Sequence, residues 1–312
     1  MILKYLKNSH SYLIVLFIIF GLLFFSASIF TEEFKNIDNI FPFYSYILLF
    51  FCFVITLLHS IGLNNLIYEK DVIKKPNFVI GVVFLLLNTT FIINYKMILF
   101  SFGMLWFLYY LLSLYKQKRP FSLVFNAGII LSILSIYIPS VLVFVTVILF
   151  SCLVFRNISW RIIVLSVLSL FIPYIFLWVY QIAINETLYI PELCLASPSY
   201  SFNFLNMYLH QKIWWCLIAV VSVLSFFELF RWMYKKSIRS RESFIVIIFY
   251  FIIGVLAFLF SQNKETLVFI FIPLSVVIGN FFVYYKKARV GGFIFFLFLF
   301  SSIFYRVSMI NM

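Results

Sequence analysis

The chain has 312 residues, of which 65% are hydrophobic and only 11% are charged, and its formal net charge is +13. A soluble protein carries roughly 25% charged residues, so this composition excludes a soluble domain. The apolar runs are continuous, whereas the strands of a membrane β-barrel alternate apolar and polar residues over about ten positions. We therefore expect an all-α, polytopic transmembrane helical bundle, because a helix satisfies its own backbone hydrogen bonds within lipid.

The N-terminal half of the chain predicts seven membrane spans. The first covers about residues 11–30. Its apolar part is longer than the roughly 7 to 15 apolar residues of a signal peptide, and more apolar runs follow it, so we interpret it as a retained helix. The six spans after it end near Leu63, Ile93, Tyr115, Ile138, Phe155 and Ala183.

The C-terminal half begins with the longest connection, residues 185–212, which we expect on the outer side. Its second part, SYSFNFLNMYLH, mixes aromatic and polar residues, as is typical of a segment lying in the membrane interface. Four more spans end near Trp232, Ser261, Asn280 and Arg306. Eleven spans of about 20 residues leave no room for a separate soluble domain, so we expect one integral membrane domain over residues 1–312.

The basic residues predict the orientation, because short cytoplasmic loops are enriched in Lys and Arg. With the N-terminus in the cytoplasm and the C-terminus outside, only five of the 23 basic residues lie on the outer side: Lys35, Lys96, Lys212, Lys264 and Arg306. The positive charge is then an orientation signal with anionic membrane lipid as its partner. We expect no nucleic-acid partner, since the chain offers no soluble basic surface interleaved with aromatic residues. The expected location is the bacterial inner membrane.

The first outer loop carries the candidate catalytic residues Glu32, Glu33 and Asp38. A carboxylate at the mouth of a membrane span can act as a general base on an acceptor hydroxyl, or can bind a metal that holds a lipid phosphate. Alternatively, the three acids belong to a solvated loop that only reinforces the topology. The sequence has no motif that requires a cofactor or a resident metal, and we expect neither.

A second candidate region is the stretch SQNKETLVFIFIPLSVVIGN, residues 261–280, in which Lys264 and Glu265 begin the tenth span and Pro273 lies inside it. Lys264 can contact the phosphate of a lipid-linked substrate, with Glu265 as its partner. Lys96, Lys212 and Arg306 can complete a phosphate cradle on the same face. The alternatives are a capped helix start for the first pair and snorkelling anchors for the other three.

Polar residues within the expected spans are few and should face the interior of the bundle: His59, Asn88, Asn126, Gln181, Glu228 and Asn280. No charged group lies clearly at mid-membrane, which argues against an ion-coupled transporter. The four cysteines, Cys52, Cys152, Cys194 and Cys216, form no close pair, so the sequence indicates neither a disulfide framework nor a zinc site.

The chain resembles one known family over most of its length, and two stretches carry the resemblance. The start KYLKNSHSYLIV and the late stretch NKETLVFIFIPLSVVIGNFF look like a Bacteroidota family of uncharacterised multi-pass inner-membrane proteins, described only as a domain of unknown function. This resemblance implies a location and a lineage but no activity.

A partial resemblance concerns the C-type superfamily of membrane glycosyltransferases. A charged loop after the first helix, and a late outer lysine followed by an apolar helix with Pro273, are similar to that superfamily. Its members use polyprenyl-phosphate sugars at the outer face. The resemblance implies that Glu32, Glu33 or Asp38 serves as the base and that Lys264 contacts the donor phosphate.

Three functions follow as hypotheses. The first is an inner-membrane protein of cell-envelope glycan metabolism, a glycosyltransferase that uses a polyprenyl-phosphate-linked sugar at the outer face. The second is a non-catalytic scaffold subunit of an envelope assembly or secretion complex, with envelope proteins as partners. The third is a transporter of a lipid-linked intermediate, with a polar cavity lined by Asn88, Asn126 or Gln181.

Overall fold

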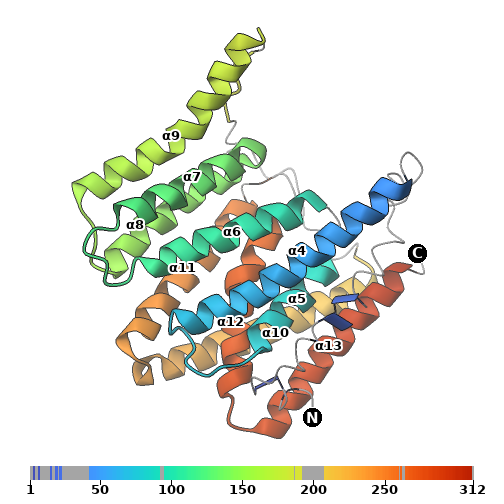
Figure 1. Ribbon diagram of the computed structural model, residues 1–312. Coiled ribbons are helices and arrows are strands. Elements are labelled where there is room, and N and C mark those ends of the chain that lie inside the picture. The colour runs from blue at the N-terminus through green and yellow to red at the C-terminus, as the bar shows by residue number, and fades with distance from the viewer. Residues whose placement is uncertain are drawn as a thin grey trace. The chain divides into compact units, whose positions relative to one another are not determined.

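The computed structural model describes most of the chain after the first forty residues. The described residues are 42–91, 95–185, 187–191, 207–259, 261 and 264–310, together with 3, 6, 7, 15, 18, 19, 21 and 22. Within these ranges every regular element is a helix, as the continuous apolar runs predict (Figure 1). The expectation of an all-α protein is therefore confirmed for the part of the chain that the structure describes.

Ten α-helices lie in the described ranges: α4 (Pro42–Glu69), α5 (Val79–Phe91), α6 (Tyr95–Ser113), α7 (Phe121–Tyr137), α8 (Val145–Val154), α9 (Trp160–Ala183), α10 (Leu209–Trp232), α11 (Ile238–Leu259), α12 (Val268–Tyr284) and α13 (Ala288–Ile310). Three short 3₁₀ helices accompany them, η2 (Pro139–Phe144), η4 (Met233–Lys235) and η5 (Lys264–Leu267). Each expected span from the second to the eleventh overlaps one of these α-helices, although α8 has only 10 residues and α12 begins at Val268, after the expected start of the tenth span at Ser261. The first expected span lies largely outside the described residues.

Six helices are long and apolar enough to cross a membrane, namely α4, α6, α9, α10, α11 and α13. The others, α5, α7, α12 and α8 with η2, are apolar but shorter. The chain is thus a multi-pass membrane protein by the length and composition of its helices. The count of eleven spans and the orientation of the termini stay predictions, as does the single domain over residues 1–312.

The contacts divide the chain into two compact units. Unit 1 comprises residues 1–102, 202–236 and 271–312, and unit 2 comprises residues 103–201 and 237–270. In unit 1, α4 packs on α5, α5 on α13, and α10 on α13. In unit 2, α7 packs on α9 and α8 on α11.

In unit 2, α7 packs closely on α9 because α7 has small residues on the face that meets α9. Ser132 Oγ donates to the carbonyl of Leu170 on α9 at 2.6 Å, and Ser135 Oγ shares a hydrogen bond with the Tyr174 hydroxyl at 2.7 Å. A Cβ added at Gly128 would lie 1.8 Å from Ser169 Oγ. Residues spaced by three or four lie on one face of a helix, and small residues on that face allow close approach where lipid supplies no hydrophobic drive for association. This face therefore fixes α7 against α9.

Unit 1 brings together segments that the charge pattern predicts to lie on one side of the membrane. The backbone N–H of Phe78, in the α4–α5 loop, donates to the Leu6 carbonyl at 2.9 Å. The Nζ of Lys75, in the same loop, lies 5.3 Å from the centroid of the Tyr284 ring at the end of α12. Leu6, the α4–α5 loop and the end of α12 therefore share one end of unit 1, which is consistent with the predicted alternation.

Candidate functional site

A basic pocket opens between two helix connections of unit 2 and has a volume of about 1340 Å³. One wall is the α6–α7 connection and the start of α7, and the other is the α8–α9 connection and the start of α9. The lining includes five cations, Lys116, Lys118, Arg119, Arg156 and Arg161, and contains no Asp or Glu. We call this site the loop pocket.

The two connections hold their shape through matching turns. Lys116 and Arg156, which follow α6 and α8, adopt positive φ angles of 57° and 59°. Such a left-handed residue commonly ends a helix and turns the chain away from the helix axis. The side-chain amide of Asn157 then donates to the Leu114 carbonyl at 2.6 Å, while its backbone N–H donates to the Cys152 carbonyl at 2.8 Å. The Asn157 side chain thus ties the two walls of the pocket together.

Two helix starts add to the positive potential of the loop pocket. Pro120 is the N-cap of α7, and Ser159 is the N-cap of α9, with neither side chain bonded to its own helix as a cap. Unpaired N–H groups and the helix dipole make the start of a helix favourable for an anion. The cations and the helix starts therefore both attract a negatively charged ligand.

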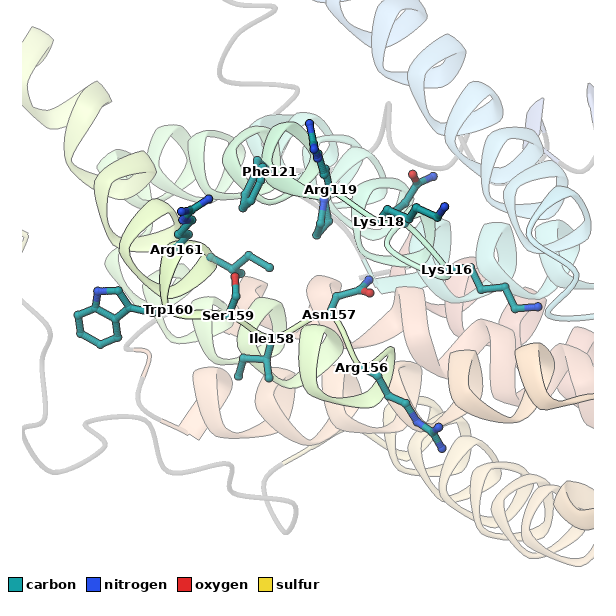
Figure 2. Close-up of a pocket in the computed structure, with 13 residues that line it drawn as sticks. Lys116, Lys118, Arg119, Phe121, Arg156, Asn157, Ile158, Ser159, Trp160 and Arg161 are labelled. Atoms are coloured by element: carbon teal, nitrogen blue, oxygen red, sulfur yellow. The ribbon is translucent and has the colours of Figure 1, made fainter.

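Figure 2 shows how the lining side chains are arranged. Arg119 and Arg161 belong to opposite walls, while Trp160, Arg156 and Lys116 point away from the space between the walls. Trp160 is 76% exposed. An exposed tryptophan beside basic loops at the ends of apolar helices is typical of a segment that meets the membrane interface.

A sixth cation, Arg239, lies over the ring of Tyr115 at the same end of unit 2. The guanidinium carbon of Arg239, at the start of α11, lies 5.3 Å from the Tyr115 ring centroid, and Lys116 Nζ lies 5.5 Å from it. The ring also packs edge-on against Phe155 at 5.7 Å between centroids. A cation over an aromatic face is attracted by the ring quadrupole, so Tyr115 holds positive charge next to the pocket without neutralising it.

The predicted outer-face residues fall into different parts of the chain. Glu32, Glu33 and Asp38 lie outside the described residues. The backbone of Lys264 and Glu265 forms the start of η5 in unit 2, and Lys96 is an exposed residue in the first turn of α6 in unit 1. The meeting of the acidic loop with Lys264 therefore stays a prediction.

Lys212 and Arg306 lie at the same end of the helix pair α10 and α13. The indole N–H of Trp214 donates to Ser302 Oγ at 3.2 Å, and the rings of His210 and Tyr305 are 5.5 Å apart. These contacts make the two helices antiparallel, so the start of α10 lies beside the end of α13. Arg306 is only 7% exposed, which means that protein encloses this cation.

Three of the predicted interior residues, His59, Asn88 and Asn280, are confirmed as buried in unit 1, whereas Asn126, Gln181 and Glu228 are half-buried. His59 is fully buried between aromatic rings, 4.1 Å from Phe84 and 5.9 Å from Phe102 between centroids. Asn280 is 2% exposed, and its Oδ1 accepts a hydrogen bond from the Nζ of Lys236 at 2.6 Å. The sequence predicts that Asn280 faces the interior but does not reveal its cationic partner.

The charge pattern alone interprets the loop-pocket cations as orientation signals and does not reveal that they line one pocket. A sharper signal was present in two motifs: KQKRP puts three cations directly before α7, and RNISWR puts Arg156 before α9 and Arg161 in its first turn. Two such motifs flanking one helical hairpin predict an anion site if the helices are adjacent.

No protein-family model, curated protein or solved structure matches this chain. The site must therefore be interpreted from its own chemistry.

Proposed function

We propose that this protein is an inner-membrane protein of cell-envelope glycan metabolism that binds a polyprenyl-phosphate-linked intermediate, and that the loop pocket holds the phosphate. The observation that carries the proposal is that five cations from two connections line one pocket beside two helix starts, with no carboxylate in the lining. Arginine favours phosphate because its planar fork of donors matches two phosphate oxygens.

The surroundings of the pocket suit a ligand that is part lipid. Apolar helices of unit 2 lie on the membrane side of the two connections, and the exposed Trp160 borders the basic lining. A polyprenyl chain can stay in the bilayer while its phosphate reaches the cations. A small soluble phosphate ester would gain only the electrostatic part of this interaction.

Binding by the purified protein in neutral lipid nanodiscs tests the proposal. The ligands are a polyprenyl phosphate and the polyprenol of the same chain length. We expect saturable binding of the phosphate at least tenfold tighter than that of the alcohol. The triple variant Lys118→Gln, Arg119→Gln, Arg161→Gln should lose most of this preference.

A matched control separates the pocket from general positive charge. The variant Arg231→Gln, Lys287→Gln, Arg289→Gln removes three exposed cations of unit 1, so its net charge falls equally. It should bind the phosphate like the unmodified protein. Equal losses in the two triple variants would mean that the basic residues only attract anionic lipid, and the proposal would be wrong.

A second proposal is that the protein transfers the sugar at the outer face as a glycosyltransferase. The enclosed Arg306 and the nearby Lys212 support it, because a buried cation at a helix end suits the phosphate of a sugar donor. Glu32, Glu33 or Asp38 would act as the base. Changing these three acids to Ala should alter the envelope glycans of the cell, and unchanged glycans would exclude the catalytic version in favour of a scaffold or a transporter.

A further inference from the structure

A tryptophan at the end of α10 contacts two lysines of unit 1. Trp232 is the last residue of α10, and the Nζ of Lys235, in η4, lies 5.0 Å from the centroid of its ring. The Nζ of Lys286, in the connection between α12 and α13, lies 5.2 Å from the same centroid. Ammonium groups from two separate segments of the chain are therefore placed around one aromatic ring.

The shared ring keeps two like charges close together. Because both Nζ atoms lie about 5 Å from one centroid, they are at most about 10 Å apart. This separation is comparable to the Debye length of about 8 Å at physiological ionic strength, so salt screens their repulsion only in part. The ring attracts each cation through its quadrupole but carries no net charge. Among the residues that the structure describes, no carboxylate forms an ion pair with Lys235 or Lys286. An anion beside the ring would therefore interact favourably with both.

The three residues lie where apolar helices of unit 1 end. The helices α10 and α13 are both long and apolar enough to cross a membrane, and Lys286 comes just before the start of α13. Tyr234, next to Lys235 in the chain, is 83% exposed. Tryptophan and tyrosine concentrate at the level of the lipid headgroups, and lysine stems extend from helix ends toward the same level. The two ammonium groups are therefore expected at the depth of the lipid phosphates.

We propose that Trp232, Lys235 and Lys286 form a binding site for the phosphate of an anionic phospholipid. The ammonium groups contact the phosphate oxygens, and the indole ring packs against the apolar part of the lipid next to its headgroup. A free phosphate ester would meet the same cations but would leave the ring and the exposed Tyr234 without an apolar partner. We call this site the Trp232 site. It shares no residue with the loop pocket, so it does not depend on the proposed function.

The charge of the site predicts which lipids it selects. Phosphatidylglycerol presents a phosphate and no cation, whereas the headgroup of phosphatidylcholine carries an ammonium group of its own, which the two lysines repel. The Trp232 site should therefore prefer phosphatidylglycerol. The predicted topology puts the end of α10 in the cytoplasm, so the bound lipid would belong to the inner leaflet.

Native mass spectrometry of the full chain in a neutral detergent measures this preference. The loop-pocket cations Lys118, Arg119 and Arg161 are replaced by Gln in the parent protein, so the loop pocket does not contribute. Phosphatidylglycerol and phosphatidylcholine with the same acyl chains are titrated separately. We expect the first phosphatidylglycerol to bind about fivefold tighter or more, because charge-assisted hydrogen bonds form with its phosphate alone. Equal affinities for the two lipids would overturn the proposal.

Two double variants separate the site from general positive charge. Lys235→Gln with Lys286→Gln should abolish most of the preference. Lys287→Gln with Arg289→Gln removes the same charge from neighbouring positions but leaves the ring and its two lysines, and should keep the preference. All four positions are exposed, so the Tm of both variants without added lipid should match that of the parent. Equal losses of preference would mean that the basic residues only attract anionic lipid, and the assignment would be wrong.

The ring and the source of the phosphate are tested in the same assay. Trp232→Leu keeps both cations but removes their common contact, so the preference should fall about threefold, whereas Trp232→Phe retains an aromatic face and should keep most of it. A Trp232→Leu variant that binds like the parent would contradict the site. An excess of free glycerol 3-phosphate should leave lipid binding unchanged, and displacement of the lipid would overturn the lipid assignment in favour of a free ester. Because this background lacks the loop-pocket cations, failure here leaves the proposed function standing.

Discussion

The Nζ of Lys236 lies 2.6 Å from the Oδ1 of Asn280, which joins the end of α10 to the last turns of α12 across 44 residues of sequence. The amide oxygen is nearly inaccessible to water, because Asn280 is only 2% exposed. A neutral amide can orient an ammonium group but cannot offset the loss of hydration as a carboxylate does. The pair holds Lys236 in place, and burial lowers the pKa of its ammonium group to about 7.

The first prediction concerns this titration. With a pKa of about 7, Lys236 is roughly nine-tenths neutral at pH 8, whereas an ordinary lysine is roughly 0.4% neutral there. Competitive acetylation followed by mass spectrometry should give a midpoint near pH 7 for Lys236. The variant Asn280→Asp puts a negative charge beside the ammonium group and should raise the midpoint by one unit or more.

A neutral replacement serves as the control for that shift. Asn280→Leu removes the hydrogen-bond acceptor without adding charge, so the midpoint of Lys236 should stay at or below that of the unmodified protein. A midpoint near 10 in the unmodified protein would show that the ammonium group is hydrated, and would contradict the burial of this side chain.

The second prediction concerns the contact between α7 and α9. Gly128→Ala adds a Cβ 1.8 Å from Ser169 Oγ and 2.8 Å from Ser169 Cβ, so the serine must move and its hydrogen bond to the Ser166 carbonyl must break. Overpacking of this kind costs about 1–3 kcal/mol. Thermal unfolding in detergent should show a lower Tm for this variant.

A double variant and a matched glycine test the cause. Ser169→Gly removes both clashing atoms, so Gly128→Ala combined with Ser169→Gly should recover most of the lost Tm relative to Ser169→Gly alone. Gly292→Ala, in α13, adds a Cβ with no atom within 4 Å and should leave the Tm unchanged or slightly raised. A loss at Gly292 as large as at Gly128 would point to a general effect of the glycine substitutions.

The third prediction concerns Asn157, which ties the walls of the loop pocket. Asn157→Leu leaves the Leu114 carbonyl without its 2.6 Å donor, which should cost about 1–3 kcal/mol of stability. Phosphate binding at the loop pocket should also weaken, because the two connections are no longer held together. Gln117→Leu changes an exposed amide of the same connection and should leave the stability unchanged; an equal loss of stability from both variants would remove the special role of Asn157.

The helices of the described residues follow from the sequence because lipid imposes simple requirements. A run of about 20 apolar residues must be helical, and polar or proline-containing connections must end it. The helix α7 illustrates this, since it begins after Pro120 and ends two residues before Pro139, close to the expected span that ends at Ile138. Local chemistry decides such boundaries, so the sequence predicts them.

The candidate sites depend on contacts that no local pattern encodes. The sequence assigns Lys118, Arg119, Arg156 and Arg161 to one side of the membrane, but their place in one pocket requires the packing of α7 on α9. In the same way, Asn280 is one of several interior polar residues, and its pairing with Lys236 depends on how the end of α10 meets α12. Charge periodicity therefore predicts the side of the membrane, while tertiary packing determines the site.

The fourth prediction tests the orientation of the chain through the two ends of α6. Lys96 lies in the first turn of this helix and Lys118 follows its end, so a spanning α6 puts them on opposite sides of the membrane. Single cysteines at these positions, in a background without Cys52, Cys152, Cys194 and Cys216, can be labelled with a membrane-impermeant maleimide. In intact cells stripped of the outer membrane, Lys96→Cys should react, whereas Lys118→Cys should react only after the membrane is opened.

Two further positions extend this test to both units. Lys287 and Arg241 are exposed residues beside the starts of α13 and α11, and the predicted topology puts both in the cytoplasm with Lys118. Cysteines there should be protected in intact cells, because an odd number of spans separates each of them from Lys96. If Lys118→Cys reacts in intact cells and Lys96→Cys does not, the orientation is the inverse of the predicted one. If only one of Lys287→Cys and Lys118→Cys reacts, the number of spans between these two positions is odd. An inverted orientation would move the loop pocket to the outer face, where a polyprenyl-linked sugar would meet it after translocation.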